Sequence, residues 1–284
     1  MNADLSPGRV VRLAPGVRRV VAPNPGMMTG PGTNTYILGE RDLGVIDPGP
    51  AIASHIAAIL GAVDASVRWV FVTHTHPDHS PGAAMLADRC GAELIGKPPP
   101  AAGPQDRTFR PDRSPADGEV FRSAEFELEV LHTPGHASNH VCYRHVATRW
   151  LFTGDHIING STVVIDPPDG NMSDYLQSLE RLGRLDCAAI APGHGDVLPD
   201  PATAIASLVR HRMGREAKVL AAVSSHPDIT LGEMVRLVYA DVDSALHALA
   251  GRSLLAHLEK LQAESRVILR DNRWRISDAS DVSK

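Results

Sequence analysis

The segment VFVTHTHPDHS places three histidines and an aspartate directly behind a run of β-branched and aromatic residues. His74 and His76 are two residues apart, so their imidazoles point to the same side of an extended backbone. Pro77 then turns the chain, and Asp78 and His79 point in a different direction from the first pair. Four metal-coordinating groups within six residues can therefore face two neighbouring metal positions, and imidazole combined with carboxylate favours zinc.

Three further groups of the same kind stand where a strand-like run meets a glycine turn. They are His136 in TPGHAS, Asp155 in LFTGDH and His194 in APGHGD. With the first four they make five histidines and two aspartates, enough for two metals if one carboxylate bridges them. Any one histidine among the 14 in the chain could be a solvated residue. The seven groups together indicate a dinuclear metal centre.

Strand-like and helix-like patterns alternate around these groups, which predicts an α/β fold. The Pro-rich, charged segment 97–118 predicts an exposed loop. Ser173 is the expected N-cap of the helix predicted over 173–185. Strands separated by helices favour a sandwich of sheets with the helices outside. The main expected strands are 33–39, 43–49, 67–74 and 187–195, and the expected helices are 53–63, 80–91 and 173–185.

After residue 202 the composition changes to long helical patterns. Helices are expected over 203–223, 230–240 and 248–266, followed by a hairpin over 267–277. Three helices and a hairpin form a winged-helix pattern. The hairpin carries arginines, yet acidic residues are interleaved with them, so the pattern does not favour DNA binding.

The whole chain limits the function classes. Its 284 residues, 43% apolar and 21% charged, are typical of a globular protein, and a net charge of −5 does not decide whether the partner is anionic. No stretch resembles a signal peptide or approaches the roughly 20 apolar residues of a membrane span. The three scattered cysteines lack metal-type CxxC spacing. We expect a cytoplasmic protein without membrane contact, and a homodimer stays open.

The ordered series HxHxDH, then His, Asp and His, resembles that of the metallo-β-lactamase superfamily across residues 30–195. The resemblance implies an αββα sandwich over residues 1–202, followed by the winged-helix-like domain at 203–284. It also implies two sets of ligands with one bridge between them. The first metal would take His74, His76 and His136, the second would take Asp78, His79 and His194, and Asp155 would bridge them.

The implied chemistry is hydrolysis. A hydroxide held between two cations is a nucleophile at neutral pH, and Asp78 would act as the catalytic group that orients it. Asp47 in VIDPG matches the superfamily's first motif and would support the ligand loop, although an aspartate before proline also simply forms turns. His140 would be a second supporting group or a contact for a substrate phosphate. Two Zn²⁺ ions are the expected cofactors, and Mn²⁺ or Fe²⁺ also suits such ligands.

Several branches of the superfamily fit poorly. The best-known antibiotic-degrading enzymes are exported and carry cysteine where Asp155 stands. Only 38 residues separate Asp155 from His194, too few for the inserted domain of the β-CASP nucleases. No long basic arm of the tRNA-processing type is present, and His76 differs from the glutamate of flavodiiron proteins.

The chain is most similar to the β-lactamase-like protein 2 family, through GTNTYILG, LHTPGHASNH, FTGDHIING, NMSDYLQSLERL, APGHGDV and LLAHLEKL. Animal members of that family are endoribonucleases, so the resemblance implies cleavage of single-stranded RNA. The Pro-rich loop and the segment APNPGMMTGPG depart from the family and could reshape the substrate entrance. The alternative is a thioesterase of the glyoxalase II type, which acts on a small thioester or ester with the same metal ligands.

Overall fold

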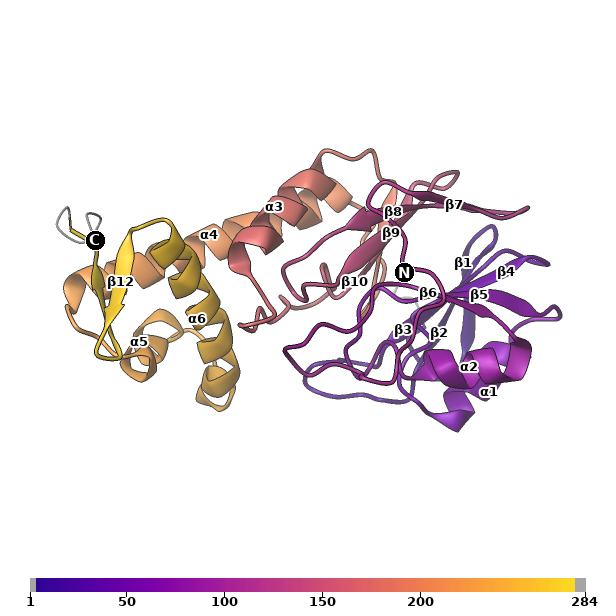
Figure 1. The fold of residues 1–284 in the computed structure, drawn as a ribbon, viewed down its shortest axis with the longest axis horizontal. Helices are drawn as coiled ribbons and strands as arrows, with labels where there is room; N and C mark the ends of the chain where they lie inside the picture. Colours follow the sequence, from indigo (N-terminus) through magenta and orange to yellow (C-terminus); the bar gives the residue numbers. More distant parts are fainter. Residues whose placement is uncertain (1–3, 279–284) are drawn as a thin grey trace.

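The computed structural model describes residues 4–278 and contains two β-sheets packed face to face (Figure 1). The first sheet has the strand order β1-β2-β3-β4-β5-β6, and the second has the order β11-β10-β9-β8-β7. Helices α1 and α2 pack on the outer face of the first sheet, and α3 and α4 pack on the second. This αββα arrangement confirms the α/β fold that the sequence predicted.

The elements follow the chain in a simple order. The strands of the first sheet are β1 Val10–Ala14, β2 Val17–Val21, β3 Asn34–Leu38, β4 Leu43–Ile46, β5 Val67–Phe71 and β6 Glu93–Ile95. Those of the second are β7 Val120–Arg122, β8 Glu127–His132, β9 Val141–His145, β10 Trp150–Gly154 and β11 Ala189–Pro192. The helices of this part are α1 Ala53–Gly61, α2 Gly82–Cys90 and α3 Met172–Gly183.

The core between the sheets is built from alternate residues of each strand. On β3, Tyr36 and Leu38 face the second sheet, whereas Ile37 faces the helices, as the two-residue period of a strand requires. Aromatic rings meet edge to face across the gap, with ring centroids of Tyr36 and Phe152 5.0 Å apart. This packing fixes the two sheets, and hence their strand ends, relative to each other.

The carboxyl ends of two parallel strand pairs carry the chemically active residues. β4 runs parallel to β5, and β10 runs parallel to β11, so the ends of each pair meet at one edge of its sheet. Asp47 follows β4, and the HTHPDH segment follows β5. Asp155 follows β10, and His194 stands just after β11. Ligand sites in α/β proteins lie at such strand ends.

The C-terminal part has a core of its own. It comprises α4 Pro201–Ser225, α5 Leu231–Val238, the short 3₁₀ helix Ser244–Leu246, α6 His247–Ala263, β12 Val267–Arg270 and β13 Arg273–Ile276. Its core contains Met234, Leu254 and Trp274 among others. This is the winged-helix arrangement that the sequence predicted. α4 spans both parts, since Ile205 packs with α3 while Val219 belongs to the C-terminal core.

Local details differ from expectation at several places. The segment 97–118, expected to be an exposed loop, buries Gln105, Asp106 and Phe109. The cap of α3 is Asn171, whose side chain accepts from the backbone N–H of Asp174, and Ser173 lies within the first turn. β5 ends at Phe71, so the histidines that follow stand in the loop. The antiparallel pair β1 and β2 was not anticipated. The three cysteines are free, and within residues 4–278 no helix has the length and apolarity to cross a bilayer.

Candidate metal centre

The seven groups singled out in the sequence come together at the strand ends as two adjoining clusters. In the first cluster, His76 Nδ1 lies 3.0 Å from both His74 Nε2 and His136 Nε2. The second cluster contains Asp78, His79, Asp155 and His194. Within each cluster one potential ligand atom of every residue lies within 4.8 Å of the others. The two clusters have the division that the resemblance implied.

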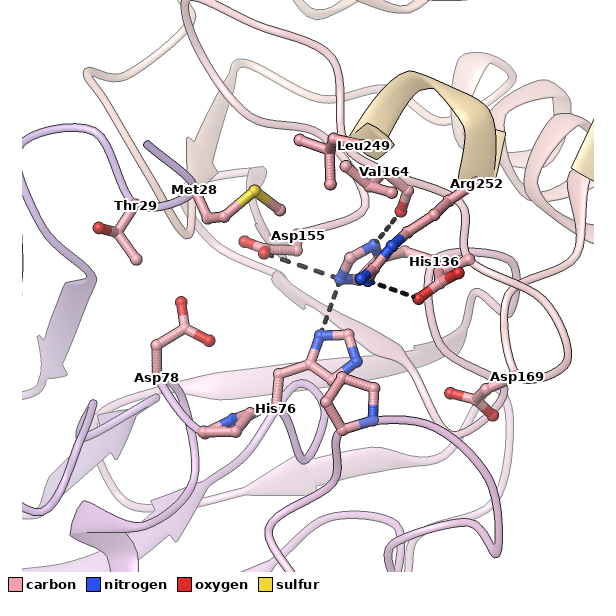
Figure 2. A pocket seen from close by; sticks show the side chains of 13 residues that line it. Met28, Thr29, His76, Asp78, His136, Asp155, Val164, Asp169, Leu249 and Arg252 are labelled. Atoms are coloured by element: carbon pink, nitrogen blue, oxygen red, sulfur yellow. Dashed lines mark hydrogen bonds and ion pairs between the residues drawn. The ribbon is translucent and has the colours of Figure 1, made fainter. Parts of the chain in front are cut away.

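Asp155 stands between the clusters and directs one carboxylate oxygen to each. Its Oδ1 lies 3.3 Å from His79 Nε2 and 3.2 Å from His194 Nε2. Its Oδ2 lies 3.7 Å from His136 Nε2, on the side seen in Figure 2. The arrangement is that of a carboxylate able to bridge two cations.

Four of the histidines have their outer ring nitrogen held by a neighbouring oxygen. His136 Nδ1 donates to the carbonyl of Val164 at 2.7 Å, and His194 Nδ1 donates to the carbonyl of Gly32 at 3.2 Å. His79 Nδ1 lies 2.9 Å from Asp47 Oδ2. A proton on Nδ1 leaves the lone pair of Nε2 for a ligand, and such contacts orient metal-binding histidines.

His74 is held in the same way through Thr73. The Thr73 hydroxyl donates to Asp47 Oδ2 at 2.7 Å, so it accepts from His74 Nδ1 at 3.1 Å. Asp47 Oδ1 also accepts from the backbone N–H of Thr73 at 2.8 Å. Asp47 thus binds the ligand loop at three points from a left-handed backbone conformation, with φ of 48°.

The buried atoms of the second cluster fit a cation. His79 Nε2, His194 Nε2 and Asp155 Oδ1 are buried and have no hydrogen-bond partner. Burial by itself would lower the pKa of His194, but the carboxylates of Asp155 and Asp78 raise it to about 10. The carboxylates therefore require a positive charge at this position, which a divalent cation supplies.

The first cluster is suited to act as neutral ligands. Burial, reinforced by the neighbouring His136, lowers the pKa of His76 to about 3. Burial and the neighbouring His79 likewise hold the pKa of His74 well below its ordinary value. Neutral imidazole is the form that coordinates a metal, so these histidines need not lose a proton on binding.

A glycine allows the strand ends to approach this closely. A Cβ at Gly193 would stand 2.7 Å from Asp155 Oδ1 and 2.8 Å from His79 Cε1. Asn34 fixes the same turn, because its side-chain amide donates to the carbonyls of Pro192 and Gly195 at 2.8 Å each. The GTN segment that leads into β3 thereby positions His194.

Two cavities open from the clusters towards solvent, and both reach His136 and Asp155. The first, of about 190 Å³, also reaches Asp78 and is shown in Figure 2. The second, of about 350 Å³, extends along residues 158–164 to His194. Three apolar side chains line both cavities. They are Met28, Val164 and Leu249.

The charges at the first cavity are mostly negative. Arg252, which reaches in from α6 beside His136 in Figure 2, is the one lysine or arginine lining it in the described part of the chain. Its guanidinium pairs with Asp166 at 2.9 Å. Asp169 is held by Gln105 and Ser138, at 2.9 and 2.6 Å. The Pro-rich loop therefore reaches the cleft wall through Gln105.

Three further side chains near the clusters lie away from the cleft. His140 is fully buried behind His74, with ring centroids 5.0 Å apart and its Nδ1 2.9 Å from the Thr133 hydroxyl. This position is compatible with the supporting role and leaves no access for a substrate phosphate. Tyr175 is buried in the core, and its hydroxyl donates to the carbonyl of His156. Arg212 is also buried and donates to the carbonyl of Val163.

The hairpin of the C-terminal part has little free charge. Arg275 pairs with Asp228 at 2.6 Å, and Arg273 donates to the carbonyl of Asp228 at 2.8 Å. Both guanidinium groups therefore hold the hairpin to the turn between α4 and α5.

Sequence reasoning missed the residues that hold or cover the clusters. The carbonyls of Gly32 and Val164 are invisible to a residue-type pattern, and Met28 and Leu249 carry no chemical signal. Thr73 could have been found, since a hydroxyl directly before the first histidine can contact it. The pairing of Arg252 with Asp166 spans 86 positions of the chain and needs the folded structure.

Known proteins match this chain over most of its length. Residues 28–194 match the family model described as the metallo-beta-lactamase superfamily, and residues 230–274 match the beta-lactamase associated winged helix domain. A beta-lactamase-like protein 2 homolog of Drosophila melanogaster is 31% identical, with 91% of each chain covered. An atrochrysone carboxyl ACP thioesterase of Aspergillus chevalieri is 33% identical, over 82% of this chain and 76% of the relative.

Solved structures agree in fold. A metallo-beta-lactamase family protein from Thermus thermophilus superposes with a TM-score of 0.78 at 22% identity, covering 93% of this chain and all of the other. A beta-lactamase domain protein from Burkholderia ambifaria gives a TM-score of 0.79 at 22% identity, covering 98% and 96% of the two chains. The similarity thus includes the C-terminal part.

Proposed function

This chain belongs to the metallo-β-lactamase superfamily and is a hydrolase with a His/Asp metal site, and we propose that its substrates are thioesters with an apolar acyl group. The observation that carries the proposal is the lining of the cleft. Met28, Val164 and Leu249 cover both cavities that open from the metal ligands. Such side chains favour an apolar group through burial of its surface.

Two zinc ions are the proposed cofactors, and manganese or iron can bind to the same types of ligand. Bound there, such ions lower the pKa of water and stabilise negative charge on a substrate oxygen. Asp155 would lie between them. His74, His76 and His136 would hold one ion, and Asp78, His79 and His194 would hold the other.

The protein groups around the ions have defined tasks. Asp78 lines the first cavity, and its Oδ2 lies 3.1 Å from His194 Nε2. A carboxylate at this position accepts a hydrogen bond from a water in the cleft and orients it for attack on the acyl carbon. In the reaction the carbon–sulfur bond breaks, the carbon gains the hydroxyl of water, and the sulfur leaves as a thiol.

The relatives support this choice of substrate. Several proteins about 30% identical to this chain over most of its length are named as ACP thioesterases. The shared ligand set alone does not separate thioester from phosphodiester hydrolysis, so the lining of the cleft is what favours the thioester.

Endonucleolytic cleavage of single-stranded RNA is the second candidate, favoured by the similarity to beta-lactamase-like protein 2 homologs over about nine-tenths of the chain. An RNA backbone, however, needs cations along its path. In the described part of the chain, Arg252 is the one lysine or arginine at the first cavity, and Asp166 neutralises it. The cleft therefore offers a phosphodiester chain little beyond the metal ions.

Parallel hydrolysis assays on zinc-loaded protein test the two candidates. The substrates are decanoyl-N-acetylcysteamine and a fluorescent single-stranded RNA, and Asp155→Ala serves as the contamination control. Thioester cleavage that the variant loses supports the proposal. RNA cleavage that the variant loses, without thioester cleavage, establishes the second candidate and refutes the first.

A further inference from the structure

A groove on the C-terminal part adjoins the catalytic cleft. It has a volume of about 530 Å³ and lies between α5 and α6. Asp166 and Arg252 line both this groove and the first cavity, so their ion pair forms a shared wall. A substrate whose reactive bond lies at the metal ligands would pass this ion pair to reach the groove.

One face of each helix builds the groove. α5 contributes Leu231 and Val235, and α6 contributes Ala248, Gly251 and Leu255, with the three- and four-residue spacings of a single helix face. Small residues leave the space open. A Cβ at Gly232 would meet no atom within 4 Å, and one at Gly251 would make an ordinary contact with Val235 at 3.5 Å.

Arg236 gives the groove a single positive charge outside any ion pair. It is exposed on α5, and within residues 4–278 it makes no hydrogen bond or ion pair. Glu233, one turn earlier, is held by the backbone and hydroxyl of Thr230 in a capping box. Arg252 is neutralised by Asp166, and His247 donates to backbone carbonyls.

We propose that this groove binds the phosphopantetheine arm of a carrier protein whose acyl thioester is hydrolysed in the cleft. The inference rests on the proposed thioesterase function. The arm is long and narrow, with methylene groups and a dimethyl-substituted carbon set between two amides and a hydroxyl; it bears its thioester at one end and ends in one phosphodiester. Arg236 matches that single charge. Coenzyme A has the same arm but carries a diphosphate in place of the phosphodiester and a further phosphate on its ribose, for which the described groove offers no additional cation.

Kinetics with one acyl group on three leaving groups tests the inference. Decanoyl thioesters of N-acetylcysteamine, coenzyme A and a holo-acyl carrier protein are compared for zinc-loaded wild type, Arg236→Glu and Ala248→Phe. Arg236→Glu should raise KM for the carrier thioester about 10-fold, since a hydrogen bond to a charged group contributes about that factor. Its kcat, and its kcat/KM for N-acetylcysteamine, should not change.

Two controls make the result specific. Arg210→Glu makes the same charge change on an exposed position of α4 outside the groove and should leave KM for the carrier unchanged. Calorimetry measures binding of the holo-carrier with a free thiol. This binding should weaken in Arg236→Glu, and also in Ala248→Phe, because the new phenyl ring would occupy the groove. This readout does not depend on turnover.

Each contrary outcome has a separate meaning. An unchanged KM for the carrier thioester in Arg236→Glu, with N-acetylcysteamine hydrolysis intact, overturns the groove assignment alone. A preference for coenzyme A over the carrier, lost in Arg236→Glu, overturns the choice of carrier. Absence of thioester hydrolysis from every substrate refutes the proposed function, while the calorimetric comparison still decides whether the groove binds the arm.

Discussion

At the scale of single residues, the candidate metal centre depends on one carboxylate that is not itself a proposed ligand. Asp47 accepts from Thr73 through both its backbone N–H and its hydroxyl, and it lies 2.9 Å from His79 Nδ1. Through these contacts it orients His79 directly and His74 by way of Thr73. Its effect should therefore appear in metal affinity before it appears in the fold.

Replacement of Asp47 by Asn tests this role. Asparagine tolerates the left-handed conformation at φ of 48° and keeps one oxygen, so the backbone should be retained. Loss of the charge opposite His79 should weaken zinc binding about 10- to 100-fold. Competition with a chromophoric chelator measures the affinity, and Asp64→Asn, outside both clusters, is the matched control. Equal zinc affinity in both variants would contradict the role.

The seven ligand candidates could be identified from the sequence because each is a metal-binding residue type that stands directly after a strand-like run, where ligand sites usually lie. Their outer partners could not, because backbone carbonyls such as those of Gly32 and Val164 leave no mark in a sequence. His140 illustrates the limit in the other direction. Its position four residues after His136 was visible, but its complete burial was not.

At the scale of elements, the start of α3 shows where capping preference alone does not decide the helix boundary. Ser173 and Asn171 are both good capping residues, and the sequence alone favoured the serine. In the structure the chain enters α3 at Asn171, where the backbone N–H of Asn171 also donates to the carbonyl of Gly135. A contact with a distant segment of the chain thus decides where the helix begins.

The two capping candidates can be compared directly. Asn171→Ala should lower the free energy of unfolding by about 1 kcal/mol, because the N–H of Asp174 loses its side-chain acceptor. Ser173→Ala should change it by less than about 0.5 kcal/mol, as a replacement outside the cap does. Urea unfolding followed by circular dichroism measures both. A larger loss from Ser173→Ala would restore the original prediction.

The helices of the C-terminal part are tied together by a buried carboxylate. Glu216 on α4 forms ion pairs with Lys260 of α6, at 2.9 Å, and with the guanidinium of Arg266, at 3.3 Å. Burial by itself raises the pKa of Glu216, but the neighbouring His257 and Lys260 side chains outweigh it and lower the pKa to about 2. The ionised form is therefore the one that the fold stabilises.

This shift predicts a pH dependence of stability. Because the pKa of Glu216 is lower in the folded chain than the ordinary 4.5, its contribution is complete above that value and is lost as the pH falls towards 2. Glu216→Gln should be less stable than wild type at pH 7, and the difference should shrink below about pH 4.5. Urea unfolding at several pH values checks this. A difference independent of pH would exclude the ionised carboxylate as the cause.

At the scale of the whole molecule, α6 joins the C-terminal part to the catalytic cleft. Ser253 accepts from the backbone N–H of Ile165 at 3.3 Å, Arg252 pairs with Asp166, and Ala256 packs with α3. The sequence predicted α6 and its partners as a winged helix. It could not show which face would meet the sandwich, because that contact joins segments 88 positions apart.

The same contact predicts that the two ends of the chain select the acyl group together. Leu249 of α6 and Met28 of the N-terminal loop line both cavities at the metal ligands. Leu249→Ala removes apolar surface that a long acyl chain can contact, so kcat/KM for decanoyl-N-acetylcysteamine should fall about 10-fold, as the loss of a few methylene contacts implies. The acetyl thioester should be hydrolysed unchanged. Leu237→Ala, at a half-exposed position of α5 away from both cavities, is the control. Equal losses for acetyl and decanoyl substrates would mean that α6 supports the centre without reading the substrate.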